Sequence, residues 1–182
     1  MQRIALLDRK DMNPDQARVW DAATRDPDAP RGGPYPIYIR LPKLFEAMQR
    51  LRACLAAGPL SLRERQIVNL AVARHWNARY PWFAQARRSR AAGISDDVID
   101  AINARATPML SDGRERVCHE LARELLSNKG LSDAAYKEAE RQLGSDDLIG
   151  LVAQIGNFSM TCLSANAFGL SPPADDPTPL AE

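Results

Sequence analysis

Apolar residues recur three and four positions apart along most of the chain, and this spacing predicts helices. One helical face in residues 42–57 carries Leu44, Met48, Leu51 and Leu55. The same pattern predicts further helices at 14–25, 61–77, 81–92, 96–105, 112–128, 133–143 and 146–168. Alternating, strand-like runs are absent apart from a short stretch at 35–41. We therefore expect an all-α domain of about seven or eight helices.

Capping residues and prolines mark where these helices begin and end. Ser61 and Glu64 form a capping box, in which each side chain can bind a free backbone N–H of the first turn. Gly93 is a good residue to end the helix at 81–92. The 13 prolines cluster at 27–42 and again at 172–179. This distribution predicts one domain over residues 1–170 and a frayed, proline-rich tail at 171–182.

Composition narrows the functional classes. The chain has 182 residues, 45% of them hydrophobic and 26% charged, which is typical of one soluble globular domain. A net charge of only +1 provides no field for holding nucleic acid or an anionic membrane, so neither is expected as a partner. The first residues are too short an apolar run for a signal peptide, and no stretch approaches the ~20 apolar residues of a membrane span.

Histidine and cysteine are scarce, and their positions exclude common metal sites. The chain holds two histidines and three cysteines, with no Cys-x-x-Cys pair. They are too scattered for a structural zinc site, so we expect no metal and no cofactor. Three isolated cysteines fit a reducing compartment better than a disulfide framework, and we expect a cytoplasmic protein.

The segment LSLRERQIVNLAVARHWNARYPWFAQA, residues 60–86, resembles the carboxymuconolactone decarboxylase / AhpD-like superfamily. The segments at 32–42, 91–95, 132–136 and 156–168 resemble its longer single-domain members in the same order. The resemblance covers roughly residues 10–170. It implies an AhpD-like helical fold, a small-molecule substrate and a homo-oligomer, either a dimer or a trimer.

The residues that give the superfamily its usual chemistry are replaced here. Peroxidase-type members have a Glu, then Cys-x-x-Cys, then a His four residues later, and these positions correspond to Gln66, Ala78, Pro81 and Gln85. None of the four can act as a thiolate or titrate near neutral pH. Thiol peroxidase chemistry is therefore not expected at this site.

Three neighbouring residues are candidate catalytic groups. His75 and Arg79 would share a face if the helix continued to residue 79, with Trp82 nearly one turn further. His75 would then act as general acid or base, and Arg79 would hold a substrate carboxylate. The alternative is that His75 packs at a helix end and Arg79 faces solvent. Tyr80, which the resemblance retains together with Trp82, is the third candidate.

Five residues are candidate substrate contacts. Gln66 and Gln85 would be the remaining polar groups if both face the ancestral cavity. Trp82 would line an aromatic-accepting pocket or belong to the core. Tyr38 would form part of the rim, and Asn157 would lie on a helix face that is either pocket wall or oligomer contact. A basic cluster at 87–90 is expected to be a solvated face.

Two functions of different classes remain open. The first is a carboxymuconolactone-decarboxylase-like enzyme that performs non-redox lyase, decarboxylation, ring-opening or isomerisation chemistry on a small aromatic-derived or carboxylated compound. The second is a non-catalytic paralogue that acts as a small-molecule-binding or assembly subunit, because loss of all four motif residues is what drift after loss of catalysis would produce.

Overall fold

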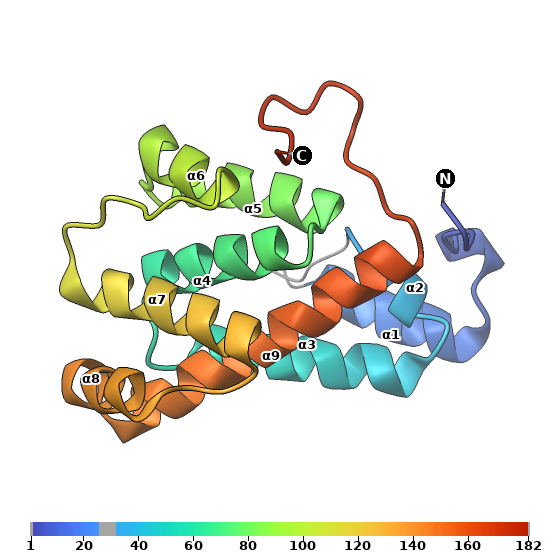
Figure 1. Ribbon diagram of the computed structural model, residues 1–182. Helices are drawn as coiled ribbons and strands as arrows, with labels where there is room; N and C mark the ends of the chain where they lie inside the picture. The colour runs from blue at the N-terminus through green and yellow to red at the C-terminus, as the bar shows by residue number, and fades with distance from the viewer. Residues whose placement is uncertain (1, 26–31, 182) are drawn as a thin grey trace.

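The computed structural model describes residues 2–25 and 32–181, and every regular element within these residues is helical (Figure 1). A short 3-10 helix, η1 (Arg9–Asp11), precedes the α-helices. These are α1 (Pro14–Thr24), α2 (Tyr35–Tyr38), α3 (Pro42–Ala56), α4 (Leu62–His75), α5 (Arg79–Ala91), α6 (Asp96–Asn103), α7 (Gly113–Asn128), α8 (Asp133–Leu143) and α9 (Ser145–Ala167).

The eight helices predicted from periodicity are confirmed, each with ends within two residues of the expected positions. The expectation of a strand-like stretch at 35–41 is wrong, because residues 35–38 form the single turn of α2. Pro36 has no N–H to give to a sheet and fits the first turn of a helix. The N–H groups of Ile37 and Tyr38 both donate to the carbonyl of Pro34, which closes this turn.

Helix α4 is the centre of the domain and contacts α5, α6, α7 and α9 (Figure 1). It is buried on nearly all sides: Ile67, Val68, Leu70 and Val72 are each 0% exposed. A helix that is buried on nearly all sides needs packing partners on every face, and here four other helices cover α4. A second, smaller cluster of buried residues joins α1, α2 and α3, where Tyr35 and Phe45 pack edge to face.

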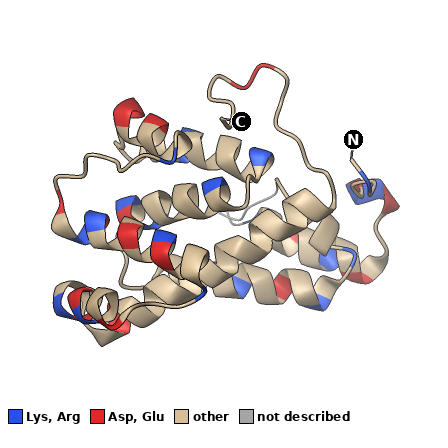
Figure 2. Cartoon of the chain, viewed as in Figure 1, with Lys and Arg blue, Asp and Glu red and all other residues tan. Residues whose placement is uncertain are grey.

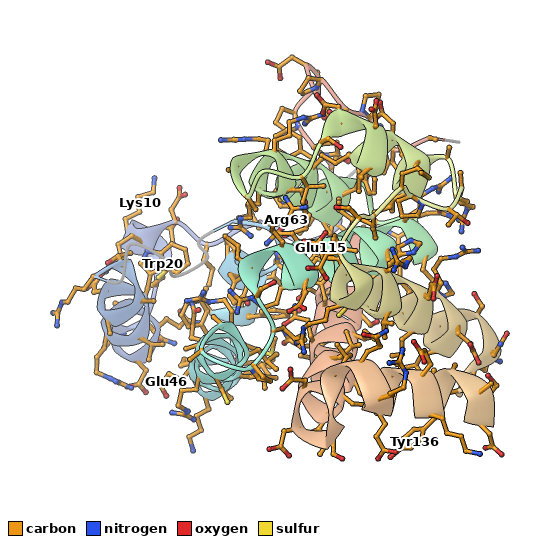
Figure 3. All side chains as sticks on the ribbon, turned by 90° about the vertical axis from the view of Figure 1, so that its left-hand side faces the viewer. Lys10, Trp20, Glu46, Arg63, Glu115 and Tyr136 are labelled. Atoms are coloured by element: carbon orange, nitrogen blue, oxygen red, sulfur yellow. The ribbon has the colours of Figure 1, made fainter. Side chains whose placement is uncertain are left out.

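Two crossed ion pairs fasten the start of α4 to the start of α7. Arg63 donates to Glu115, and Arg114 of α7 donates to Glu64 at 2.8 Å (Figure 3). Arg114 also donates to Asp147 at the start of α9. Both Glu64 and Glu115 are buried, so their carboxylates need these partners. Figure 2 shows acidic and basic residues interspersed along the helices.

The C-terminal segment lies against α5 and α6 instead of being frayed. The carbonyl of Thr178 accepts a hydrogen bond from the Trp82 indole at 3.0 Å, and its hydroxyl accepts one from Arg90. Asn103 donates to the carbonyl of Pro179 and accepts from the N–H of Ala181. The contacts of Thr178 with Trp82 and Arg90 hold the C-terminal segment on α5. They therefore help to fix the position of α5, which carries part of the candidate site.

Helix α9 is long and apolar enough to cross a membrane by length and composition alone. It nevertheless packs against α3, α4, α5, α7 and α8, and 44% of its most apolar window is buried inside the domain. Core packing accounts for the apolar residues on its buried side, while Ile149, Val152, Met160 and Leu163 are exposed.

Candidate functional site

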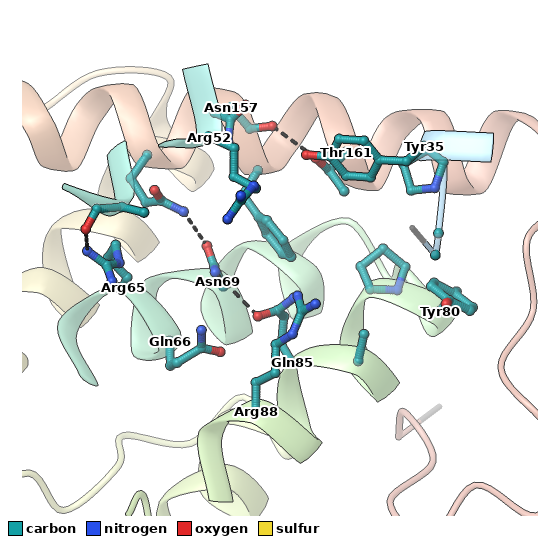
Figure 4. Close-up of a pocket in the computed structure, with 18 of the residues that line it drawn as sticks. Tyr35, Arg52, Arg65, Gln66, Asn69, Tyr80, Gln85, Arg88, Asn157 and Thr161 are labelled. Atoms are coloured by element: carbon teal, nitrogen blue, oxygen red, sulfur yellow. Dashed lines mark hydrogen bonds between the residues drawn. The ribbon is translucent and has the colours of Figure 1, made fainter. Parts of the chain in front are cut away.

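A cavity of about 710 Å³ lies between α3, α4, α5 and α9, with the Gly32–Tyr35 segment at one side (Figure 4). Its volume falls in the range of small-molecule sites. The residues that line it are Gly32, Gly33, Pro34, Tyr35, Arg52, Ala56, Leu62, Arg65, Gln66, Asn69, Tyr80, Pro81, Ala84, Gln85, Arg88, Gln154, Asn157, Phe158 and Thr161. None of these described lining residues is a Cys, His, Asp or Glu.

Three buried carboxamides form a continuous hydrogen-bonded chain across the cavity wall. Gln154 of α9 donates through Nε2 to Oδ1 of Asn69 on α4 at 2.7 Å. Asn69 in turn donates through Nδ2 to Oε1 of Gln85 on α5 at 3.4 Å. All three side chains are at least 93% buried. Buried amides that bond to one another in this way hold three separate helices in fixed register around the cavity.

Two further carboxamides line the same cavity. Gln66, one turn before Asn69 on α4, is only 7% exposed, and Asn157 follows Gln154 by one turn on α9. Within the described part of the chain, neither Gln66 Oε1 nor Asn157 Oδ1 has a hydrogen-bond partner. Since buried polar atoms are normally paired, both groups have unused hydrogen-bonding capacity at the cavity wall.

Positive charge dominates the electrostatics of the cavity. Arg52 points into it from α3 and Arg88 from α5, so the two guanidinium groups point toward one another (Figure 4). Arg65 also lines the cavity, but it donates to the carbonyls of Ala56 and Leu60 and thereby closes the end of α3. Burial raises the pKa of Tyr35 to about 12, against the opposing effect of Arg52 and Arg88. The guanidinium group of Arg88, in a described lining that holds no carboxylate, favours an anionic ligand.

The side chain of Tyr80 packs against Gly32 and Gly33, the glycine pair, at the side of the cavity. A methyl group on Gly32 would lie 2.7 Å from the Tyr80 hydroxyl oxygen, and one on Gly33 would lie 3.1 Å from Cε1 of the ring. Gly33 also has φ +63°, a conformation that favours glycine. The two glycines therefore allow the backbone to lie directly on the tyrosine.

The structure brings together four of the sequence-predicted site residues. Gln66, Tyr80, Gln85 and Asn157 all line the cavity, from three different helices. Gln66 and Gln85 occupy the positions that correspond to the Glu and the His of the peroxidase-type members. Both line the same cavity, as the sequence comparison predicts for them. Asn157 lies on the cavity-facing side of α9.

His75 and Arg79 are not among the cavity residues, and the expectation that they share a helical face is wrong. Helix α4 ends at His75, and the chain turns at Asn77, where φ is +48°. His75 packs edge to face on Trp76, and burial together with the nearby charge of Arg105 lowers its pKa. Arg79 begins α5 and is exposed.

Trp82 and Tyr38 also lie outside the cavity lining. Trp82 is 0% exposed and belongs to the core, on the side of α5 that faces the C-terminal segment. Tyr38 is buried and donates its hydroxyl hydrogen to Ser164 Oγ at 2.7 Å. Both aromatic residues are therefore packing residues, behind the cavity instead of facing it.

Sequence reasoning missed four of the polar residues that matter most: Arg52, Asn69, Arg88 and Gln154. Arg88 was expected on a solvated face; it is exposed, and it also lines the cavity from α5. A signal for two of them was present, because Asn69 is three residues after Gln66 and Arg88 is three residues after Gln85. Residues at this spacing lie on the same helical face.

None of the three cysteines is among the described residues that line the cavity. Cys54 is exposed on α3, while Cys118 and Cys162 are buried. Burial raises the pKa of Cys118 to about 12 and also raises that of Cys162, so neither buried thiol forms a thiolate readily. Within residues 2–25 and 32–181, no three His, Cys, Asp or Glu side chains form a group that could hold a metal ion.

Comparison with known proteins identifies the fold. Residues 42–124, from the start of α3 to the last turns of α7, match the carboxymuconolactone decarboxylase family. No curated protein matches the sequence significantly.

Three solved structures are similar to this chain. The first is an uncharacterized peroxidase-related protein with an alkylhydroperoxidase AhpD core from Ralstonia eutropha JMP134, with TM-score 0.76, 17% identity and coverage of 96% of this chain and 93% of that one. The second is an uncharacterized peroxidase-related protein from Silicibacter sp. TM1040, with TM-score 0.75, 18% identity and the same coverages. The third is a cysteine-to-alanine variant of the debrominase Bmp8 in complex with 2,3,4-tribromopyrrole, with TM-score 0.74, 17% identity and coverage of 97% and 96%.

At these identities the structural similarity establishes the fold. The sequence match shows that residues 42–124 are similar to the carboxymuconolactone decarboxylase family, and the structural similarity shows an AhpD-like fold over nearly the whole chain.

Proposed function

We propose that this protein binds a small carboxylated compound in the cavity and acts on it as a carboxymuconolactone-decarboxylase-like enzyme of the non-redox kind. The observation that carries the proposal is Arg88, which lines a carboxamide-rich cavity with no acidic residue in its described lining. Guanidinium groups hold carboxylates through charge-assisted hydrogen bonds, and the amide N–H groups beside them supply neutral donors.

The cavity residues suit a reaction that passes through an enolate. In a decarboxylation, the bond to the carboxylate carbon breaks, carbon dioxide leaves, and the electron pair moves onto a neighbouring carbonyl oxygen. Donors already in place at that oxygen, such as the N–H groups of Gln85, would stabilise the developing charge. The hydroxyl of Tyr80 would then supply the proton that completes the product and would recover it from water. Ring opening and isomerisation would use the same two groups.

The third similar structure supports a small unsaturated ring as the compound bound. That protein is a debrominase in complex with a tribrominated pyrrole. The cavity here is flanked by Tyr35, Tyr80 and Phe158, whose rings can pack against such a compound.

One observation favours a second candidate, a binding subunit without turnover. The described lining has no Cys, His, Asp or Glu, and burial raises the pKa of Tyr35 to about 12, far from neutrality. General acid–base catalysis works best when the pKa of the group is near the working pH. A retained cavity with no such group is also what a binding paralogue would have.

Thermal-shift titration with benzoate and its neutral isostere benzamide tests ligand binding. We expect benzoate to raise the unfolding temperature, with saturation at 100 times Kd adding about 2.7 kcal/mol, and benzamide to act much more weakly. Arg88→Ala should weaken benzoate binding at least about tenfold, as for loss of a charged hydrogen bond. Arg87→Ala is the matched control, because Arg87 is the adjacent exposed arginine and does not line the cavity. Equal binding of benzamide, or an unchanged Kd in Arg88→Ala, would overturn the proposal.

Turnover separates the enzyme from the binding subunit. A panel of unsaturated and lactone carboxylates would be incubated with the protein and followed by NMR. Product formation that falls in Tyr80→Phe supports the enzyme, whereas saturable binding with no product for any member supports the binding subunit.

A further inference from the structure

We infer that Gln154, Asn69 and Gln85 form a directional hydrogen-bond chain that orients the ligand, with its carboxylate toward α5 and a hydroxyl or amino group toward α9. The preferred ligands are then ring carboxylates that carry a hydrogen-bond donor away from the carboxylate. This inference rests on the proposed function, because it requires that the cavity bind a carboxylate.

The direction of the chain follows from its two hydrogen bonds. Gln154 uses its N–H on Asn69, and Asn69 uses its N–H on Gln85. Each carboxamide has one oxygen and one NH2 group, so the ends of the chain are the NH2 of Gln85 and the oxygen of Gln154. The hydrogen bonds of Gln85 and Gln154 within the described residues use the oxygen of Gln85 and the NH2 of Gln154, and leave the two end groups for a ligand. The chain therefore offers a donor at α5 and an acceptor at α9.

The charges of the cavity follow the same direction. Arg88 is three residues after Gln85 and adds positive charge beside the donor end, while Arg52 reaches toward it from α3 (Figure 4). The residues that α9 contributes to the lining are all uncharged: Gln154, Asn157, Phe158 and Thr161. A carboxylate is thus favoured at the α5 end, and the α9 end suits a neutral group.

The reversed orientation would be penalised at both ends. A carboxylate at α9 would face the oxygen of Gln154, which cannot donate to it. A hydroxyl at α5 could accept a hydrogen bond but would leave the charge of Arg88 without an anionic partner. To accommodate the reversed ligand, all three buried amides would have to rotate together, because each hydrogen bond fixes the orientation of the next amide. The orientation of the amides and that of the ligand are therefore coupled.

A matched ligand series tests the inference by titration calorimetry. We expect 3- or 4-hydroxybenzoate to bind about five- to tenfold more tightly than benzoate, as for one additional hydrogen bond, and the corresponding methoxybenzoate to lose this gain. In Gln154→Met the advantage of the hydroxyl should disappear, so that the Kd of hydroxybenzoate becomes equal to the Kd of benzoate in the same variant. Thr161→Val is the control, because it changes a polar cavity residue of α9 outside the chain, and the advantage should persist there.

The outcomes distinguish this inference from the proposed function. If benzoate and the hydroxybenzoates all fail to bind, the proposed function is wrong and the inference falls with it. If benzoate binds through Arg88 but neither hydroxyl position improves affinity, or if the improvement survives in Gln154→Met, only the inference is overturned. The comparison of hydroxy- and methoxybenzoates on the unmodified protein remains decisive even if Gln154→Met does not fold.

Discussion

At the scale of single residues, the contact between Tyr80 and the glycine pair can be tested directly. In Gly32→Ala the new methyl group would lie 2.7 Å from the tyrosine hydroxyl oxygen, whereas the next ring atom, Cζ, is 3.9 Å away. We expect the substitution to lower the free energy of unfolding by ~1–3 kcal/mol, as other overpacking changes do. Adding Tyr80→Phe should restore most of the loss, because it removes the clashing atom.

Gly33→Ala provides the matched comparison, measured by urea unfolding in the presence and absence of Tyr80→Phe. At Gly33 the methyl group would meet the ring carbon Cε1, and φ is +63°, so the backbone is strained whatever the side chain opposite. No rescue by Tyr80→Phe is expected there. Equal rescue at both glycines would contradict the described geometry.

His119 should make stability depend on pH. It is 2% exposed, and burial, with a smaller effect of Arg123, lowers its pKa from 6.5 to about 4. The unfolded chain therefore takes up a proton first as the pH falls below 6.5. This contribution to stability is complete above pH 6.5 and is lost at up to about 1.4 kcal/mol per pH unit toward pH 4. Denaturation curves from pH 7 to pH 5 should show this slope, and His119→Gln should flatten it; parallel curves for both proteins would contradict the assignment.

Single residues also show what a sequence can reveal about a site. Gln66 and Gln85 were expected to face one cavity and both line it, because helical spacing and the motif pattern fix their faces. For Trp82 the sequence left pocket and core open, because an aromatic residue beside a helix break looks the same whether a ligand or the C-terminal segment covers it; the structure places it in the core. Gln154 lies one turn before Asn157, so spacing could have indicated its face, but its hydrogen bond to Asn69 is a tertiary contact that spacing does not reveal.

At the scale of helices, the N-terminus of α4 combines a cap with an ion pair. Ser61 Oγ accepts from the N–H of Glu64 at 3.1 Å, and the Glu64 carboxylate accepts from the N–H of Ser61 at 2.7 Å. Ser61→Ala should cost about 1 kcal/mol of the free energy of unfolding, as for other N-caps, and Ser61→Gly only a few tenths. Glu64→Ala should cost more than Ser61→Ala, because Arg114 also loses its buried partner. Urea unfolding with an unchanged m-value checks this order, and a smaller loss in Glu64→Ala would refute it.

Helix positions were predictable to within two residues, because caps, glycines and prolines act locally. The break between α4 and α5 was predicted, but its conformation was not. The chain adopts a left-handed conformation at Asn77, a residue that is neither glycine nor proline, and separates His75 from Arg79. Arg74 and Arg105 both donate to the Asn77 side chain and stabilise this turn. The hydrogen bond from Arg105 comes from a distant segment, which periodicity does not reveal.

At the scale of the whole molecule, α9 carries a stripe of exposed apolar residues, which we call the α9 stripe. Its members are Ile149, Val152, Met160 and Leu163, with exposed fractions of 68%, 42%, 38% and 46%. At 100° per residue these four positions fall within about 80° of one another, with Gly156 between them. A continuous apolar stripe on an exposed helix is typical of an interaction surface.

We expect this stripe to join copies of the chain into a dimer or trimer. Light scattering should then give a multiple of the 20.1 kDa chain mass at micromolar concentration. Ile149→Glu places a charge at the most exposed position of the stripe and should shift the particle to the mass of one chain, with the helical circular dichroism unchanged. Met109→Glu is the matched control, because Met109 is 92% exposed and lies outside α9, so its assembly should match the unmodified protein. A 20 kDa particle for the unmodified chain would rule out assembly, whereas an Ile149→Glu variant that stays assembled would place the contact on another face.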